Sequence, residues 1–251
     1  MSALWRSLSA WAHYAALWLS TLWLALALAW SLLAPFDFGY PLWYRVMDIG
    51  AHLDRYASQN IYKPGFQNLS AAEHQALFGA LRKAVQQGGA GLDSIGYRGP
   101  DGHWRALLRP AERGHLQDVA WLLQQARWLT LAMALLWGLL WWRRRRAAVL
   151  SSGQQLAGLA LLGGPLVLWL LWSGPTAVFY QFHHWLFRAG HPWFFYWEES
   201  LMSSLMKAPM LFGGIALLLA ALAWPSAWLL YWLARPRRPL DTGGAVVPQS
   251  L

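Results

Sequence analysis

The sequence contains no cysteine, which excludes disulfide bonds and a thiol nucleophile. Charged residues are also scarce, because Asp, Glu, Lys and Arg together make up only 12% of the 251 residues. In contrast, 57% of the chain is hydrophobic and 20 residues are tryptophan. This balance is too apolar for an ordinary soluble domain. The chain is therefore predicted to be an integral membrane protein.

Four stretches are long and apolar enough to cross a bilayer, whose hydrocarbon core needs roughly 20 such residues. They are predicted at residues 11–34, 121–142, 148–172 and 209–233. The first resembles a signal peptide, but its apolar run exceeds the roughly 7 to 15 residues of a signal h-region, which indicates an uncleaved anchor. The predicted fold class is an all-α integral membrane protein with four transmembrane helices, in a single membrane domain spanning residues 1–251.

Positive residues gather beside these spans and predict their orientation. Arginine fills positions 143–146 between the second and third spans, and Arg235, Arg237 and Arg238 follow the fourth. Lys and Arg in short loops stay on the cytoplasmic side. A cytoplasmic loop at 143–147, a cytoplasmic tail at 234–251 and a cytoplasmic N-terminus are therefore predicted. These arginines make up most of the formal net charge of +9, so the basic balance does not indicate a nucleic-acid partner.

The two remaining connections, 35–120 and 173–208, are predicted to be extracytoplasmic loops with short helices and a small hairpin. The apolar stripe at 42–56 predicts one amphipathic helix. Ser70 followed by Glu73 forms a capping box that predicts a helix start. Residues 95–108 surround a Gly-Pro-Asp-Gly turn that predicts the hairpin. Pro110 predicts the start of a long helix that continues into the second span.

A polar cluster surrounded by aromatic residues lies between the third and fourth spans. The third span is predicted to break at Gly174 and Pro175, and a second helical stretch would place Phe179, His183 and Phe187 on one face. Trp and Tyr are favoured at the membrane interface, so this stretch is predicted to lie there. A polar cluster in such a setting is a candidate reaction site.

The helix that begins at Pro110 carries further candidates. His115 and Asp118 are three residues apart and therefore share one face of that helix. Arg127 is predicted to lie inside the outer hydrocarbon, where a charge is costly unless it is paired. It is interpreted either as a snorkelling anchor or as a residue that binds a lipid or substrate phosphate.

Several of these residues form a pattern that resembles the DUF1461 family, whose studied members are the lipoprotein intramolecular transacylases (Lit). The pattern consists of His115-Leu116-Gln117-Asp118-Val119 before a span, then Phe182-His183, Phe187, Trp193-Phe194, Leu201-Met202, Pro209 and Phe212. The resemblance covers the four spans, their order and both histidine motifs. The chain departs from the pattern in its Trp content and its doubled His183-His184.

The resemblance implies an enzyme of the bacterial cytoplasmic (inner) membrane with its active site on the extracytoplasmic face. Its substrate would be a lipoprotein whose N-terminal cysteine carries a diacylglyceryl group. One ester-linked acyl chain would move to the cysteine α-amino group and give a lyso-form lipoprotein. By motif, the two essential histidines fall on His115 and His183. No metal or other cofactor is implied, and the remaining partners are membrane lipids.

Acyl transfer to an amine needs a base and an acid, and two imidazoles can divide these tasks. We expect His183 to be the base or an acyl-accepting nucleophile, and His115 to be its acid partner, oriented by Asp118. Asp118 is equally interpreted as neutralising Arg113 or a helix end. Candidate substrate-binding residues are Arg113, Arg127, Tyr180, Arg188, Trp193 and Glu199. Glu199 is alternatively a helix cap, and His184 and His191 are interpreted as rim or loop residues.

Two other functions are compatible with parts of the sequence. A metal-dependent membrane lipid hydrolase would bind zinc through three protein ligands. The candidate ligands are the histidines His115, His183, His184 and His191, together with an acid such as Asp118 or Glu199. However, no His-Glu-x-x-His spacing occurs in the sequence. A non-catalytic membrane scaffold or transport component would carry polar residues along its spans. The predicted spans are nearly free of ionisable groups apart from Arg127, which favours a site at one face over a pore.

Overall fold

The computed structural model describes residues 3–144, 147–187 and 190–236. Within these ranges, four helices are long and apolar enough to cross a membrane. They are α1 (Ala3–Leu33), α5 (Pro110–Arg143), α6 (Ser152–Leu186) and α8 (Met210–Ala234). The prediction of a mostly helical chain with four helices that are able to span a membrane by their length and composition is confirmed. The third helix begins later than predicted, because Ser151 caps it by accepting a hydrogen bond from Gln154 N at 3.3 Å.

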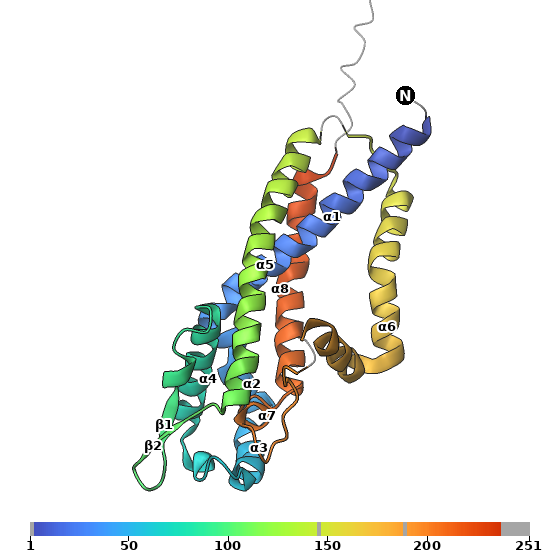
Figure 1. The fold of residues 1–251 in the computed structure, drawn as a ribbon. Coiled ribbons are helices and arrows are strands. Elements are labelled where there is room, and N and C mark those ends of the chain that lie inside the picture. The colour runs from blue at the N-terminus through green and yellow to red at the C-terminus, as the bar shows by residue number, and fades with distance from the viewer. Residues whose placement is uncertain (1–2, 145–146, 188–189, 237–251) are drawn as a thin grey trace, which may run out of the picture.

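Three of the long helices form a bundle, and the fourth stands beside it. α1 crosses α5 and α8, whereas α6 runs apart from them for most of its length (Figure 1). Within the bundle, Trp18 stacks on Tyr231 with ring centroids 4.1 Å apart, and Trp23 Nε1 donates to Thr130 Oγ1 at 3.0 Å. In contrast, no residue of α6 is buried in the described structure. The bundle is therefore the packed part of the membrane region.

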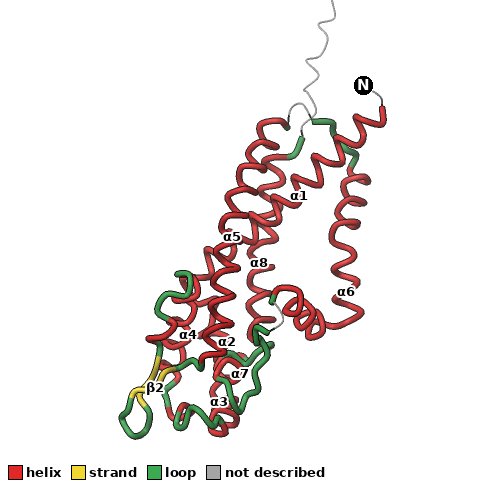
Figure 2. The backbone as a smooth tube through the Cα atoms, in the orientation of Figure 1, coloured by secondary structure: helices red, strands yellow, loops and turns green. Residues whose placement is uncertain are grey.

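The two ends of the molecule differ in charge and in structure. The start of α1, the end of α5, the start of α6 and the end of α8 lie together at one end (Figure 1). We call this the basic end, because Arg143, Arg144 and Arg235 lie there. The opposite end, which we call the loop end, holds the short helices and the only strands of the described chain (Figure 2).

The loop end is built from short elements. They are α2 (Tyr40–Val46), α3 (Ile49–Tyr56), α4 (Ala71–Gln86), β1 (Gly96–Arg98), β2 (Trp104–Ala106) and α7 (Leu201–Leu205). β1 and β2 pair antiparallel and form a hairpin at the position the sequence indicated. α4 begins with the capping box: Glu73 N donates to Ser70 Oγ at 3.3 Å, and Ser70 N donates to Glu73 Oε2 at 2.7 Å.

The expectation of one amphipathic helix over residues 42–56 is wrong. The chain leaves the helix at Asp48, which has a left-handed backbone with φ 50°, so α2 and α3 are two separate helices. Val46 is 66% exposed, whereas Ile49 and Leu53 are fully buried. The residues of the apolar stripe therefore lie in two environments, because only the second half of the stripe faces the core.

A continuous apolar core fills the loop end and includes one face of the first turns of α5. Tyr40 is fully buried, stacks on Phe78 with centroids 3.9 Å apart, and donates its hydroxyl to Leu205 O at 2.7 Å. Burial of each large apolar side chain contributes roughly 1.5–3 kcal/mol. This core fixes the start of α5 and the segment before α7, which both carry residues of the candidate site.

Candidate active site

The first turns of α5 carry a buried face. Glu112 is fully buried and His115, three residues later on the same face, is 7% exposed. Glu112 accepts hydrogen bonds from Arg109 N at 2.7 Å and from Ser200 Oγ. These bonds tie the start of α5 to the segment that precedes α7. His115 is therefore presented from a rigid part of the molecule.

The second part of the site comes from the far end of α6. Gly174 interrupts this helix with φ 75° and ψ 157°, in a region of backbone space that is essentially restricted to glycine. Pro175 follows and further disfavours a helical residue before it. As predicted, the chain bends here, and the rest of α6 runs back toward α8 (Figure 1). This turned segment, residues 175–186, carries His183.

The bend brings His183 next to His115. Their ring centroids are 6.4 Å apart, with 30° between the planes. His183 Nδ1 lies 2.8 Å from Phe179 O, and because a carbonyl only accepts, Nδ1 carries the proton and Nε2 keeps a free lone pair. His115 Nδ1 is buried and has no hydrogen-bond partner among the described residues. The two histidines singled out in the sequence thus lie in one site.

Aromatic rings surround the two imidazoles. Phe187 lies 4.7 Å from His115 and 5.5 Å from His183, measured between ring centroids. Phe195 lies 6.0 Å from His115, and Trp193 lies 5.0 Å from His183. Such walls exclude water and lower the local dielectric constant, which strengthens every hydrogen bond and charge interaction inside. The arrangement can support proton transfer and hydrogen bonding to a developing charge.

Asp118 does not orient His115 as expected. Its Oδ2 accepts a hydrogen bond from Nδ1 of His191 at 2.7 Å, and His191 lies in the loop after α6, as interpreted. The two residues line a groove of about 220 Å³. The other lining residues are Trp121, Leu122, Leu186 and Phe187. We call it the Asp118–His191 groove. It adjoins the histidine pair, because Phe187 contributes to both.

Two of the predicted substrate-binding residues lie beside the histidines. Trp193 contacts His183, and Tyr180 lies 5.8 Å from Trp193 between ring centroids. Both supply a polar hydrogen-bond donor on an apolar ring. Arg188, a further candidate, lies outside the described residues.

Other candidates have partners away from the imidazoles. Arg113 forms an ion pair with Asp93, in the loop after α4. Glu199 forms an ion pair with Arg109 at 3.1 Å. A side chain that already holds a partner must exchange it to contact a substrate.

Arg127 is also engaged. Its Nη2 donates to Gln86 O, the last residue of α4. The last carbonyls of a helix have no partner within the helix, and a cation is favoured there. This contact compensates for the cost of an arginine on an apolar helix.

A buried polar cluster beneath His115 escaped the sequence analysis. Besides Glu112 and Ser200 it contains Lys63, which is 7% exposed and donates Nζ to Ala106 O. Burial lowers the pKa of Lys63, and the charge of Glu112 opposes this shift. Glu112 and Ser200 are 88 residues apart, so no local pattern indicates their contact. The sequence shows only that Glu112 lies in the first turn of a helix, and an acid at that position is typical of an N-terminal helix cap.

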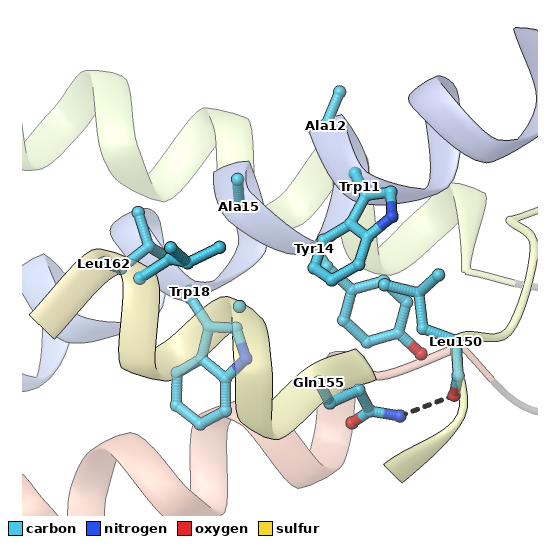
Figure 3. A pocket seen from close by; sticks show the side chains of 10 residues that line it. Trp11, Ala12, Tyr14, Ala15, Trp18, Leu150, Gln155 and Leu162 are labelled. Carbon is cyan, nitrogen blue, oxygen red and sulfur yellow. Dashed lines mark hydrogen bonds between the residues drawn. The ribbon is translucent and has the colours of Figure 1, made fainter. Parts of the chain in front are cut away.

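A second cavity lies at the basic end (Figure 3). It has a volume of about 330 Å³ and lies between α1 and the start of α6. Trp11, Tyr14 and Trp18 line it from α1, and Gln155 Nε2 donates to Leu150 O at 2.9 Å (Figure 3). Its described lining contains no acid, histidine, lysine or arginine, so it does not offer acid–base chemistry.

The described residues also contain no group of three or more His, Asp or Glu arranged to hold a metal ion.

Residues 104–207 match the family model for the lipoprotein intramolecular transacylase Lit. This match supports the resemblance seen in the sequence, and it includes His115, Asp118, His183 and His191. The search of curated proteins and the search of solved structures gave no match.

Proposed function

We propose that this protein is a membrane-embedded acyltransferase that acts on bacterial lipoproteins. It moves an ester-linked acyl chain from the diacylglyceryl group to the α-amino group of the N-terminal cysteine, which yields a lyso-form lipoprotein. The observation that carries the proposal is the His115–His183 pair, with centroids 6.4 Å apart, inside the segment that matches the Lit family.

His183 acts as the base. Its Nδ1–H is held by Phe179 O, so Nε2 is free to take a proton from the attacking amine. The new amide N–C bond forms, the ester bond between the acyl carbon and the glyceryl oxygen breaks, and the amine proton passes to that oxygen. The reaction is therefore balanced without any further reactant.

His115 acts as a hydrogen-bond donor to the reacting oxygen atoms, while His183 acts as the base. Its burial beside Phe187 and Phe195 lets a ring N–H stabilise the oxyanion or the leaving glyceryl oxygen in a site that excludes water. Excluding water also protects the ester from hydrolysis. Tyr180 and Trp193 supply further donors near the acyl group. The scheme uses no metal or other cofactor.

The orientation follows from the charge difference between the two ends. Lys and Arg are retained on the cytoplasmic side, and Arg143, Arg144 and Arg235 lie at the basic end. Both termini are therefore cytoplasmic, and the loop end with the histidine pair faces the extracytoplasmic side of the bacterial cytoplasmic membrane. The diacylglyceryl lipoprotein reaches the site there from the surrounding lipids.

Mass spectrometry of a lipoprotein's N-terminal lipopeptide tests the proposal. The cells lack other N-acylating enzymes and express the parent protein, His115→Ala or His183→Ala. We expect a lyso, N-acylated lipopeptide from the parent and a loss of about 100-fold or more of this product in each variant. A diacylglyceryl lipopeptide that remains unchanged with a well-expressed parent protein would refute the function.

His184→Ala is the matched control. His184 is the neighbour of His183 and contacts Trp193 at 5.0 Å between centroids, but it makes no ring contact with His115 in the described structure. We expect this variant to form the product as the parent does. Equal losses in His183→Ala and His184→Ala would assign the effect to the structure of the segment and not to the His183 base.

A further inference from the structure

The Asp118–His191 groove contains a carboxylate with unused capacity. Asp118 Oδ2 accepts the His191 Nδ1–H bond at 2.7 Å, and Oδ1 has no hydrogen-bond partner among the described residues. The side chains of Asp118 and His191 are 30% and 51% exposed, so the pair is open to a ligand. An ionised carboxylate accepts several hydrogen bonds, and His191 leaves most of this capacity available.

The remaining lining of the groove favours a cation. Trp121 and Phe187 present aromatic rings, which attract cations through their faces, and Leu122 and Leu186 are apolar. The described lining residues include Asp118 and neither Lys nor Arg. A small cation with several N–H donors therefore fits this groove better than a phosphate does.

The groove opens beside the reacting groups. Asp118 lies one turn from His115 on the same face of α5, a rise of about 4.5 Å along the helix. Phe187 lines the groove and lies 4.7 Å from His115 and 5.5 Å from His183 between ring centroids. A ligand held by Asp118 is thus separated from the histidine pair by the width of one side chain.

We propose that the Asp118–His191 groove is the subsite for the α-ammonium group of the substrate's N-terminal cysteine. This inference rests on the proposed function. An α-amino group has a pKa of about 8, so it is mostly protonated in neutral solution. Asp118 binds the ammonium group, one proton leaves to water, and the neutral nitrogen attacks the ester carbonyl carbon at the histidine pair.

The subsite also explains how substrate and product are distinguished. The substrate has a cationic nitrogen, whereas the nitrogen of the N-acylated product is an uncharged amide. Asp118 therefore holds the substrate and loses its partner once transfer is complete. Lipoproteins whose N-terminus is already acylated bind weakly for the same reason.

Direct binding to the purified full-length protein in detergent micelles tests this inference. The two probes are diacylglyceryl-cysteine peptides in which ether bonds replace both esters, one with a free α-amino group and one with an N-acetyl group. Neither probe transfers an acyl chain. We expect the parent to bind the free-amine probe about tenfold more tightly, as for one hydrogen-bonded charge, and Asp118→Asn to bind both probes about equally.

Asp101→Asn is the control, because Asp101 also forms an ion pair, with Arg105 in the β1–β2 hairpin. It should keep the preference of the parent. Equal binding of both probes by the parent, or a preference retained in Asp118→Asn, would overturn the subsite while leaving the proposed function intact. Failure of the parent to bind either probe, together with absence of transfer to a diester lipopeptide, would refute the proposed function itself.

Discussion

The two sources of the candidate site differ in how they are held. His115 stands on α5 beside Leu116, which belongs to the apolar core of the loop end, with Glu112 fully buried one turn away. His183 stands on the turned segment of α6, a helix without any buried residue in the described structure. We call the α5 part of the site the packed side and the α6 part the exposed side. The packed side holds His115 in a fixed position, and the bend of α6 on the exposed side places His183 next to it. This difference predicts that substitutions on the two sides separate activity from stability.

Gly174→Ala should give the largest effect on activity. An alanine at φ 75° and ψ 157° costs about 1–3 kcal/mol, so the bend opens and His183 moves away from His115. A displacement of about 1 Å at a reacting group can cost about 100-fold in rate. We expect such a loss in lipopeptide mass spectrometry, with an unchanged thermal unfolding midpoint, because no residue of the described α6 is fully buried.

Gly163→Ala provides the control for this substitution. Gly163 also belongs to α6, and a Cβ there meets no atom within 4 Å. This variant should keep full activity. Full activity in Gly174→Ala would mean that the bend does not position His183.

Glu112→Ala should damage the packed side. It leaves the Ser200 hydroxyl and the Arg109 backbone N–H without their buried acceptor. We expect the free energy of unfolding to fall by about 1–3 kcal/mol, and activity to fall with it because the segment before α7 loosens. Thermal unfolding followed by tryptophan fluorescence measures the first effect. An unchanged midpoint would show that this contact does not anchor α5.

Phe187→Ala should give a smaller effect, at the boundary between the two sides. The ring contacts both His115 and His183, and its loss admits water to the site. We expect a loss of transfer of roughly fivefold, or about 1 kcal/mol, together with released free fatty acid. Trp185→Ala, which removes an exposed ring that stacks on Trp169, should leave the ratio of transfer to hydrolysis unchanged.

Tyr40→Phe should give the smallest effect and act on stability alone. It removes the hydroxyl that donates to Leu205 O in the core of the loop end. We expect a loss of about 1 kcal/mol in the free energy of unfolding and unchanged transfer. A loss of activity at unchanged stability would indicate that this core also controls the geometry of the histidines.

Local patterns predicted much of the fold. The four spans follow from the length of their apolar runs, the bend of α6 from Gly174 and Pro175, and the start of α4 from Ser70 and Glu73. The break at Asp48 was not predicted, because a left-handed backbone at a non-glycine residue depends on what α2 and α3 pack against.

The sequence by itself determined the membrane helices, the charge difference between the two ends and the two histidines worth testing. Bilayer hydrocarbon acts on each segment according to its own composition, so these features need no knowledge of the chain's path. Only the tertiary structure decided that Asp118 pairs with His191, 73 residues away, and that Glu112 pairs with Ser200, 88 residues away. Such contacts depend on where the bend of α6 and the core of the loop end carry distant segments.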